Sequence, residues 1–462
     1  MLKKLPDSVL IILGILVLFI ILTWVVPPGE FQRTQLGSRT VVVPGTFTQV
    51  EANPQGIGSF FLAPIKGFIA AAEIIAFVFL VGGAFSLVTG TGAVDAGLYR
   101  VLQFSKQHPS YKKWIVPVII ILFSLGGSTF GMAEETLVFV LVTLPLALAL
   151  GYDSLTGVGI SFVAAGAGFA GAFINPFTIG VAQGIAELPP GSGMGYRIIV
   201  WVLFTAVTIW FIMRHANRVE KDPTRSPMYE LDQNWDASHY EDKKEDLVFN
   251  LPRKLVLWAL LLSLVVLIYG VNKWGWYIEE IAGLFVALGF VSAILGKLKG
   301  NDAVKKFMNG AKDMMTAAMI IGLARGLLVV AEEGRIIDTI LNGIAQGAEG
   351  VPRYMTVEIM FLLQSCLNFF VPSGSGQAAL TMPILTPLSD IMEISRQSTV
   401  LAYQFGDGIS NLIIPTSGVT MGILAIAKIP YQVWLKWVLP LVIIMAVMAM
   451  LLLLPPMILF EW

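Results

Sequence analysis

Long apolar segments separated by short polar connections run along most of the 462-residue chain. Each is roughly 20 residues long, the length at which a helix rising about 1.5 Å per residue crosses a hydrocarbon core about 30 Å thick. The pattern therefore predicts an all-α protein that crosses a membrane many times. The predicted spans are residues 8–26, 73–92, 155–187, 197–213, 255–270, 277–296, 313–331, 395–427 and 432–455.

Two further apolar stretches are interrupted by small and turn-forming residues. The run at residues 114–125 would form only about 18 Å of helix, half the membrane, before it meets the glycines and hydroxyl residues of 126–131. The run at residues 357–371 meets Pro-Ser-Gly-Ser-Gly at 372–376, and such residues favour turns. Both apolar patterns then resume. They predict re-entrant helical hairpins with tips at membrane depth, at about residues 114–150 and 356–389.

Three short motifs occur twice, in the same order. S-x-x-G-x-A begins at Ser128 and Ser373, T-x-P-x at Thr143 and Thr381, and G-V-x-x-G-I at Gly180 and Gly418. The last two pairs are both 238 residues apart, which indicates an internal repeat. An odd number of predicted crossings separates the hairpins, so they would enter the membrane from opposite faces. Inverted repeats of this kind are a recurrent plan among secondary transporters.

A proline interrupts one helix in each repeat, just before the last motif. The interruptions are Asn-Pro-Phe-Thr at residues 175–178 and Ile-Pro-Thr-Ser at 414–417. Proline lacks the backbone N–H and displaces the carbonyl one turn earlier, which frees oxygen atoms to bind a cation or a substrate. An ordinary proline kink is the alternative for either helix alone, but two related breaks beside two hairpins favour binding. We predict broken helices at about residues 155–187 and 395–427.

The predicted organisation has three parts: membrane repeat 1 at residues 1–213, a cytoplasmic linker at 214–252 and membrane repeat 2 at 253–462. Most of the 30 Lys and Arg fall in the linker and in other loops on the same side, which the positive-inside rule assigns to the cytoplasm. We expect a bacterial inner-membrane protein with a cytoplasmic amino terminus and a periplasmic carboxyl terminus. The first span follows Lys3 and Lys4 without a small-residue cleavage site, so we expect it to be retained.

Composition narrows the class of protein further. Hydrophobic residues make up 56% of the chain and charged residues 13%, so the chain is far more apolar than a soluble domain. The formal net charge of −1 gives no sign of a nucleic-acid partner. Cys366 is the only cysteine, and His108, His215 and His239 fall in predicted connecting segments. We therefore expect no internal disulfide, no zinc centre, no bound cofactor and no enzyme activity.

The hairpin tips and helix breaks carry the polar groups that a transporter needs. Sodium prefers hydroxyl and carbonyl oxygens, while a substrate carboxylate prefers the positive ends of half-helices. Small residues that only allow close helix packing are the alternative. The predicted sodium ligands are Ser128, Asn175, Thr178, Ser373, Thr416 and Ser417.

Ionisable residues at membrane depth are the sharpest signal. Glu134 and Glu135 follow the first tip, Asp407 precedes the second break, and Arg325 interrupts an apolar helix. A charge near the bilayer centre costs about 2.5 to 3.5 kcal/mol on insertion scales, so it is usually paired, solvated or functional. A structural ion pair between Arg325 and one glutamate is the alternative. Neighbouring glutamates point about 100° apart on a helix, so one could pair while the other faces a cavity.

The second hairpin has no acidic pair in the corresponding place, where Ala379 and Leu380 stand. The pair thus breaks the symmetry of the repeats, which suggests that it binds substrate or a coupling proton. The predicted substrate-binding residues are Ser128, Thr129, Glu134, Glu135, Asn175, Ser373, Ser375, Gln377, Asp407, Asn411 and Thr416.

Residues 126–136, 174–180, 372–379 and 407–418 together resemble the YfcC-like branch of the anaerobic four-carbon-dicarboxylate carrier family. The resemblance covers nearly the whole chain. That family lies in the ion transporter superfamily, so the resemblance implies a homodimeric scaffold whose transport domains move by an elevator motion. It also implies that substrate and coupling ions lie between tips and breaks, here at Ser128, Thr129, Asn175, Thr178, Ser373, Ser375, Asn411, Thr416 and Ser417. The tips read Ser-Thr-Phe and Ser-Gly-Ser, where the sodium-dicarboxylate branch has Ser-Asn-Thr.

These observations predict a secondary active transporter that moves amino acids, above all basic ones, by exchange or with sodium or protons. Three acids against Arg325 give the presumed cavity a negative balance, which favours a substrate with a cationic group. The alternative substrate is a four-carbon dicarboxylate held by Arg325. A passive channel, from a different class, would need a continuous polar stripe, whereas the polar residues here cluster at the breaks.

Overall fold

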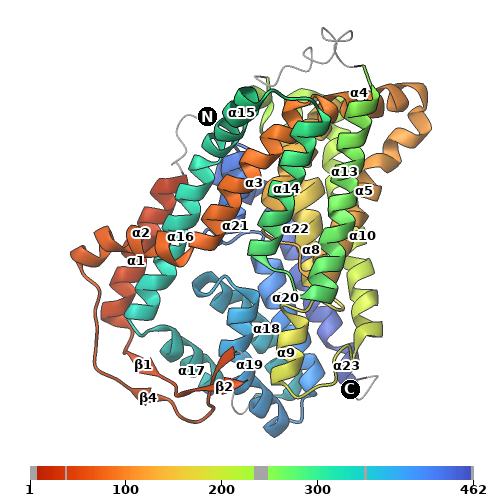
Figure 1. Ribbon diagram of the computed structural model, residues 1–462. Helices are drawn as coiled ribbons and strands as arrows, with labels where there is room; N and C mark the ends of the chain where they lie inside the picture. Colours follow the sequence, from red (N-terminus) through yellow and green to blue (C-terminus); the bar gives the residue numbers. More distant parts are fainter. Residues whose placement is uncertain (1–7, 37–38, 234–247, 348–350, 459–462) are drawn as a thin grey trace.

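The computed structural model describes residues 8–36, 39–233, 248–347 and 351–458 (Figure 1). Within these ranges, seven helices are long and apolar enough to cross a membrane, and most of the remaining described chain is also helical. The protein is therefore a multi-pass membrane protein. The seven helices lie at Ala72–Gly90, Lys113–Phe130, Met194–Lys221, Leu251–Tyr269, Ile278–Leu295, Met315–Glu333 and Tyr431–Ile458.

One set of helices, the first helix group, packs around α16. Within it α16 packs on α1, α2 and α3, while α14 packs on α3 and α13. A Cβ added to Gly67 of α2 would lie 2.2 Å from the Gly322 carbonyl oxygen of α16, so these two helices are in backbone contact. The group consists of α1 (Ser8–Val25), α2 (Ile57–Ala70), α3 (Ala72–Gly90), α4 (Ala93–Gln107), α13 (Leu251–Tyr269), α14 (Ile278–Leu295), α15 (Gly300–Asp313) and α16 (Met315–Glu333).

The second helix group packs around α8 and α20. In this group α8 contacts α5, α10 and α20, and α20 also contacts α18, α19 and α22. The two groups meet where α16 packs against α21. The members are α5 (Pro109–Phe130), α6 (Thr136–Ala149), α7 (Ser154–Val158), η2 (Gly159–Val163), α8 (Ala164–Ala170), α9 (Ile179–Ile185), α10 (Met194–Lys221), α18 (Arg353–Phe370), α19 (Gly374–Ile391), α20 (Arg396–Ser410), α21 (Gly418–Ile426) and α22 (Tyr431–Leu453).

Four short non-helical breaks interrupt the second helix group. Residues 131–135 separate α5 from α6, residues 171–178 separate α8 from α9, residues 371–373 separate α18 from α19, and residues 411–417 separate α20 from α21. The breaks of the two proline-interrupted helices thus lie at the predicted prolines. Re-entry of the two helix pairs from opposite faces, and an inverted repeat, stay predictions.

The first predicted tip is wrong in position. Residues 126–129, predicted as a turn, continue α5, which has 22 residues rather than a half-membrane length. A Cβ added to Gly127 would lie 2.0 Å from the Ala165 carbonyl oxygen. The glycine therefore serves close packing of α5 on α8, and the helix ends only at Gly131, whose φ of 72° lies in the left-handed region.

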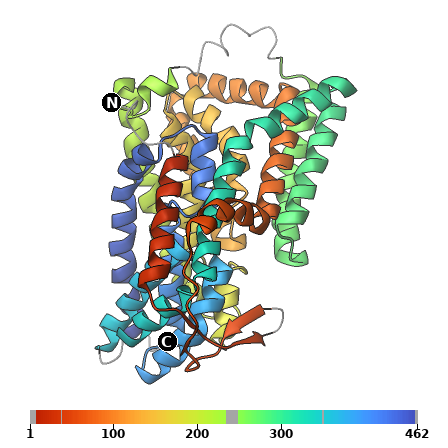
Figure 2. The same ribbon diagram turned by 90° about the vertical axis from the view of Figure 1, so that its left-hand side faces the viewer.

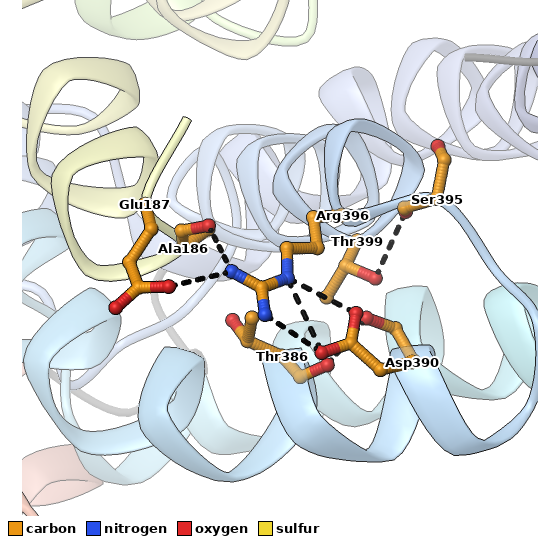
Figure 3. Close-up of polar contacts among 8 residues, drawn as sticks. Ala186, Glu187, Thr386, Asp390, Ser395, Arg396 and Thr399 are labelled. Atoms are coloured by element: carbon orange, nitrogen blue, oxygen red, sulfur yellow. Dashed lines mark hydrogen bonds and ion pairs between the residues drawn. The ribbon is translucent and has the colours of Figure 1, made fainter. Parts of the chain in front are cut away.

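A polar cluster around Arg396 joins parts of the second helix group that are far apart in the sequence (Figure 3). The guanidinium donates to the carbonyl oxygen of Ala186 at 2.9 Å and to Glu187 at 3.1 Å, both just after α9. It also donates to both carboxylate oxygens of Asp390 near the end of α19, at 3.0 and 2.8 Å. The ends of α9 and α19 are thus held together.

Short strands that the hydropathy pattern did not predict lie between α1 and α2, at the end of the molecule opposite α4 and α15 (Figures 1 and 2). The Phe31 N–H donates to Asp338 of α17 (Ile337–Gly347) at 2.9 Å, and Arg33 pairs with the same carboxylate at 3.0 Å. Strand β3 also packs against α19. The pairs are β1 (Gly29–Glu30) with β4 (Thr48–Gln49) and β2 (Arg33–Leu36) with β3 (Arg39–Val42).

The start of the predicted linker is helical, because α10 extends to Lys221 and is followed by η3 (Pro223–Arg225) and α11 (Tyr229–Asp232). His215 therefore lies in a helix rather than in a connecting segment, while His239 lies outside the described residues. Asp153, which caps α7, accepts hydrogen bonds from His215 Nε2 at 2.7 Å and Ser226 Oγ at 2.6 Å. Burial raises the pKa of Asp153, but the hydrogen bonds outweigh burial and leave that pKa below its ordinary value.

Candidate substrate-binding site

A cavity of about 280 Å³ lies where the two helix groups face each other. The first group contributes Glu73 of α3, Tyr277 at the start of α14 and Arg325 of α16. All four breaks contribute to the other wall. The lining residues from the breaks include Gly131, Met132, Ala133, Glu134, Glu135, Phe177, Thr178, Pro372, Ser373, Asn411 and Ser417.

The acidic pair lies in the break between α5 and α6. Glu135 is 6% exposed, and its Oε2 accepts a hydrogen bond from the Ala133 N–H at 3.1 Å. Glu134 is half-buried, and its side chain forms no hydrogen bond or ion pair with another residue among those described. The structure thus separates the two carboxylates: one is bonded to the local backbone, and the other is available to the cavity.

The first broken helix is held against this acidic break. The N–H groups of Phe173 and Ile174 donate to the Ser128 carbonyl oxygen at 3.3 and 3.4 Å. Asn175 is fully buried, and its Oδ1 accepts from the Phe177 N–H at 2.9 Å. Thr178, at 1% exposure, lines the cavity with a hydroxyl that has no partner in the described parts of the chain. An unpartnered buried hydroxyl is costly unless something else bonds to it.

The second hairpin closes over the first broken helix at Gly374. A Cβ at this position would lie 2.6 Å from Thr178 Cγ2 and 3.0 Å from Asp407 Oδ2. The Gly374 carbonyl oxygen accepts a hydrogen bond from Tyr403 Oη at 2.6 Å. Only glycine fits this close approach, which brings together residues of the two predicted repeats.

Asp407 lies beneath the second hairpin and does not line the cavity. The side chain is fully buried, with Oδ1 accepting from Asn411 Nδ2 at 3.0 Å and Oδ2 unpartnered among the described residues. Thr416, also predicted to bind substrate, is 2% exposed and outside the cavity lining, and its hydroxyl likewise has no described partner. Asp407 and Thr416 are therefore set back from the cavity, whereas Thr178 lines it and also approaches Asp407 at Gly374.

Four other predicted residues, Ser128, Thr129, Asn175 and Gln377, do not line the cavity. Ser128 and Thr129 both donate to the Leu125 carbonyl oxygen, at 3.0 and 2.7 Å. Gln377 is fully buried and donates to the Gln364 side chain at 2.6 Å. In α5, helix geometry turns the Ser128 and Thr129 hydroxyls back to the preceding turn. Ser373, Ser375 and Asn411 do line the cavity, as do Glu134 and Glu135.

Arg325 lies at the junction of this cavity with a second one, of about 440 Å³, on the side of the strands. Ser373 also lines both, and the second cavity contains Arg33, Arg335 and Asp338. Within the described chain no salt bridge joins Arg325 to either glutamate of the pair. The alternative of a structural ion pair is therefore not what this structure forms.

Sequence reasoning missed Glu73 and Tyr277. Glu73 is the first residue of a predicted span, and a lone acid beside an apolar run is a usable signal. Tyr277 precedes α14, and it lines the cavity together with Glu73, Glu134, Glu135 and Arg325. The charged side chains of the cavity therefore surround one small space.

Comparison with known proteins gives a match along nearly the whole chain. The family described as C4-dicarboxylate anaerobic carrier matches residues 5–457. The chain belongs to this carrier family. YfcC of Escherichia coli (strain K12), named provisionally as a basic amino acid antiporter, is 37% identical over 476 residues, which cover 93% of this chain and 92% of YfcC. The resemblance inferred from the four sequence segments is thereby confirmed.

Other similar proteins also align with nearly the whole length of this chain. An uncharacterized protein of Haemophilus influenzae is 29% identical over 95% of this chain and 94% of its own. Among solved structures, the YdaH transporter of Alcanivorax borkumensis gives a TM-score of 0.42 at 14% identity over 99% of both chains. MtrF of Neisseria gonorrhoeae gives 0.43 at 16% identity over 98% of this chain and 95% of MtrF.

Proposed function

We propose that this carrier exchanges basic amino acids across the bacterial inner membrane by alternating access. The charge of the cavity wall carries the proposal: Glu73, Glu134 and Glu135 face Arg325, so the wall has a negative balance. A cationic substrate would relieve that balance at a depth where an uncompensated charge is expensive. The name of YfcC in Escherichia coli points in the same direction.

The position of the cavity between two helix groups supports alternating access. Movement of the second group past the first would carry the breaks, and anything bound to them, along the membrane normal. The clamp at Arg396 would keep α9 and α19 together during such an elevator motion. We also propose that the carrier is a homodimer. The strands are proposed to lie on the periplasmic side, because α15 at the opposite end carries Lys305, Lys306 and Lys312.

For coupling, we propose that sodium or a proton binds beneath the second hairpin. Thr178 and Asp407 both approach Gly374 there, and each has an oxygen without a described partner. A carboxylate beside a hydroxyl suits either ion. Asn175, Ser373, Thr416 and Ser417 remain proposed contributors to the same ion site, whereas the Ser128 hydroxyl is already bonded to Leu125.

Uptake of a four-carbon dicarboxylate is the second candidate. It is favoured by the name of the carrier family and by three arginines, Arg33, Arg325 and Arg335, that line the strand-side cavity. Two of these already pair with acids, however: Arg33 with Asp338 and Arg335 with Glu30. Arg325 is thus the one left to bind a carboxylate among the described residues of that cavity.

Proteoliposome exchange distinguishes the two candidates. Vesicles loaded with lysine, arginine, alanine or succinate would be placed in radiolabelled lysine or succinate, with sodium and pH gradients imposed separately. The proposal expects lysine and arginine to exchange and succinate to be inert. Succinate exchange that lysine does not compete with would overturn it in favour of the dicarboxylate carrier.

A further inference from the structure

Three charged side chains of the cavity are available to a ligand. Glu135 accepts from the Ala133 N–H, which leaves Glu73, Glu134 and Arg325, none of which has a described side-chain hydrogen bond or ion pair with another residue. The cavity therefore offers two carboxylates and one guanidinium. A diamino acid with both amino groups protonated carries the complementary set: two ammonium groups and one carboxylate.

We propose that the cavity is specific for a monocarboxylate amino acid with a second cationic group, as in lysine, with Arg325 binding its carboxylate and Glu73 and Glu134 each binding one of its two cationic groups. This inference rests on the proposed function and deepens it. Charge-assisted hydrogen bonds of this kind are the strong ones, and a guanidinium matches a carboxylate in bidentate geometry. A substrate lacking one of the three groups leaves a charge of the protein unpaired.

The three side chains surround one space. All of them line the same cavity of about 280 Å³, together with Tyr277. Thr178 lines the same cavity, and its buried hydroxyl has no partner among the described residues. Glu73 and Arg325 belong to the first helix group and Glu134 to the second. The ligand would thus bridge the two groups.

Arg325 sets the direction of the ligand. It lines both cavities, so a carboxylate bound to it lies toward the strand side. Glu73 has a simpler explanation as an acid in the first turn of α3, where a negative charge favours the helix dipole. Glu279 gives a matched control, because it occupies the first turn of α14, is exposed and does not line the cavity.

The test uses lysine and three analogues that each lack one group. Norleucine lacks the side-chain amine, 6-aminohexanoate lacks the α-amine, and cadaverine lacks the carboxylate. Their inhibition of lysine exchange would be measured in proteoliposomes for the unaltered protein and for Glu73→Gln, Glu134→Gln, Arg325→Gln and Glu279→Gln. Lysine should bind about tenfold to a hundredfold more weakly to the first three variants and unchanged to the last.

The pattern across analogues decides the outcome. Inhibition by cadaverine should be unchanged in Arg325→Gln. Inhibition by norleucine should be unchanged in one glutamate variant and inhibition by 6-aminohexanoate in the other, as a pairwise cycle requires. Equal losses for all four compounds, or an equal loss in Glu279→Gln, would overturn this inference and leave basic amino acid exchange standing. If the unaltered protein does not bind lysine, the proposed function fails and this inference with it.

Discussion

The two helix pairs that meet at the cavity use their breaks in different ways. The break between α5 and α6 contains Glu134 and Glu135 and presents charge to the cavity. The break between α18 and α19 contains Val371, Pro372 and Ser373, none of them ionisable, and is followed by Gly374 packed tightly on its neighbours. The first break thus supplies charge, and the second supplies close contact over buried polar side chains.

The two broken helices also differ in the side chains that cap their first turns. The first begins at Asp153, a buried carboxylate that accepts from His215, Ser226 and Thr156. The second begins at Ser395, whose Oγ accepts from the Ser398 N–H at 3.0 Å. The first cap thus accepts from three distant or local residues at one buried carboxylate, whereas the second cap, among the described residues, bonds only within its own first turn, beside the Arg396 cluster.

Substitution of Gly374, which packs tightly at the start of α19, is expected to have the largest effect on transport. Gly374→Ala would place a Cβ 2.6 Å from Thr178 Cγ2, so overpacking of about 1 to 3 kcal/mol would oppose closure and lower lysine exchange at least about tenfold. Adding Thr178→Ser removes the clashing methyl group and should restore part of the exchange. Gly184→Ala in α9, which meets nothing within 4 Å, is the control. Full exchange by Gly374→Ala would show that the close approach is not required.

Removal of the two helix caps should differ in cost. Asp153→Ala leaves several buried donors unpaired and should lower the free energy of unfolding by about 3 kcal/mol, against about 1 kcal/mol for Ser395→Ala. Because the pKa of Asp153 is lowered in the folded state, its contribution is complete at neutral pH and is lost as the pH falls through that lowered pKa. Thermal unfolding in detergent from pH 8 to pH 3 measures both; equal costs would contradict the comparison.

Substitutions of the two buried threonines should distinguish substrate binding from ion binding. Thr178 lines the cavity and Thr416 does not. If sodium is coupled, Thr178→Val should weaken both lysine and sodium roughly tenfold, whereas Thr416→Val should raise only the sodium concentration for half-maximal exchange. Exchange that ignores sodium in the unaltered protein would leave the proton as the coupling ion.

The smallest effect is expected in α5. Ser128→Ala and Thr129→Ala remove hydroxyls that bond only to the Leu125 carbonyl oxygen among described groups, so lysine affinity should stay within about twofold. Ser375→Ala in the second hairpin, which does line the cavity, is the comparison. A large loss in the α5 variants would mean that these hydroxyls turn toward the ligand.

The sequence predicted most of what depends on local chemistry. Prolines at 176 and 415 placed the two helix breaks, and the asymmetry of Glu134 and Glu135 placed the charged wall. The predicted tip at residues 126–131 was misplaced because Gly127 lies within α5, where the lack of a side chain allows close packing on α8. Local helix propensity does not show such a tertiary contact. The helix α2 was missed because Pro64 and Lys66 interrupt its apolar pattern.

The proposed binding of a cationic substrate depends most on Glu134, the carboxylate available to the cavity. Glu134→Gln and Glu135→Gln form a matched pair, since each removes one charge while keeping size and much of the hydrogen bonding. Lysine affinity would be measured for both from pH 6 to pH 8, with folding checked by size exclusion. We expect Glu134→Gln to bind lysine at least about tenfold more weakly at every pH and Glu135→Gln to retain its affinity. Unchanged affinity in Glu134→Gln would contradict the account; if only its pH dependence flattened, Glu134 would carry a proton instead.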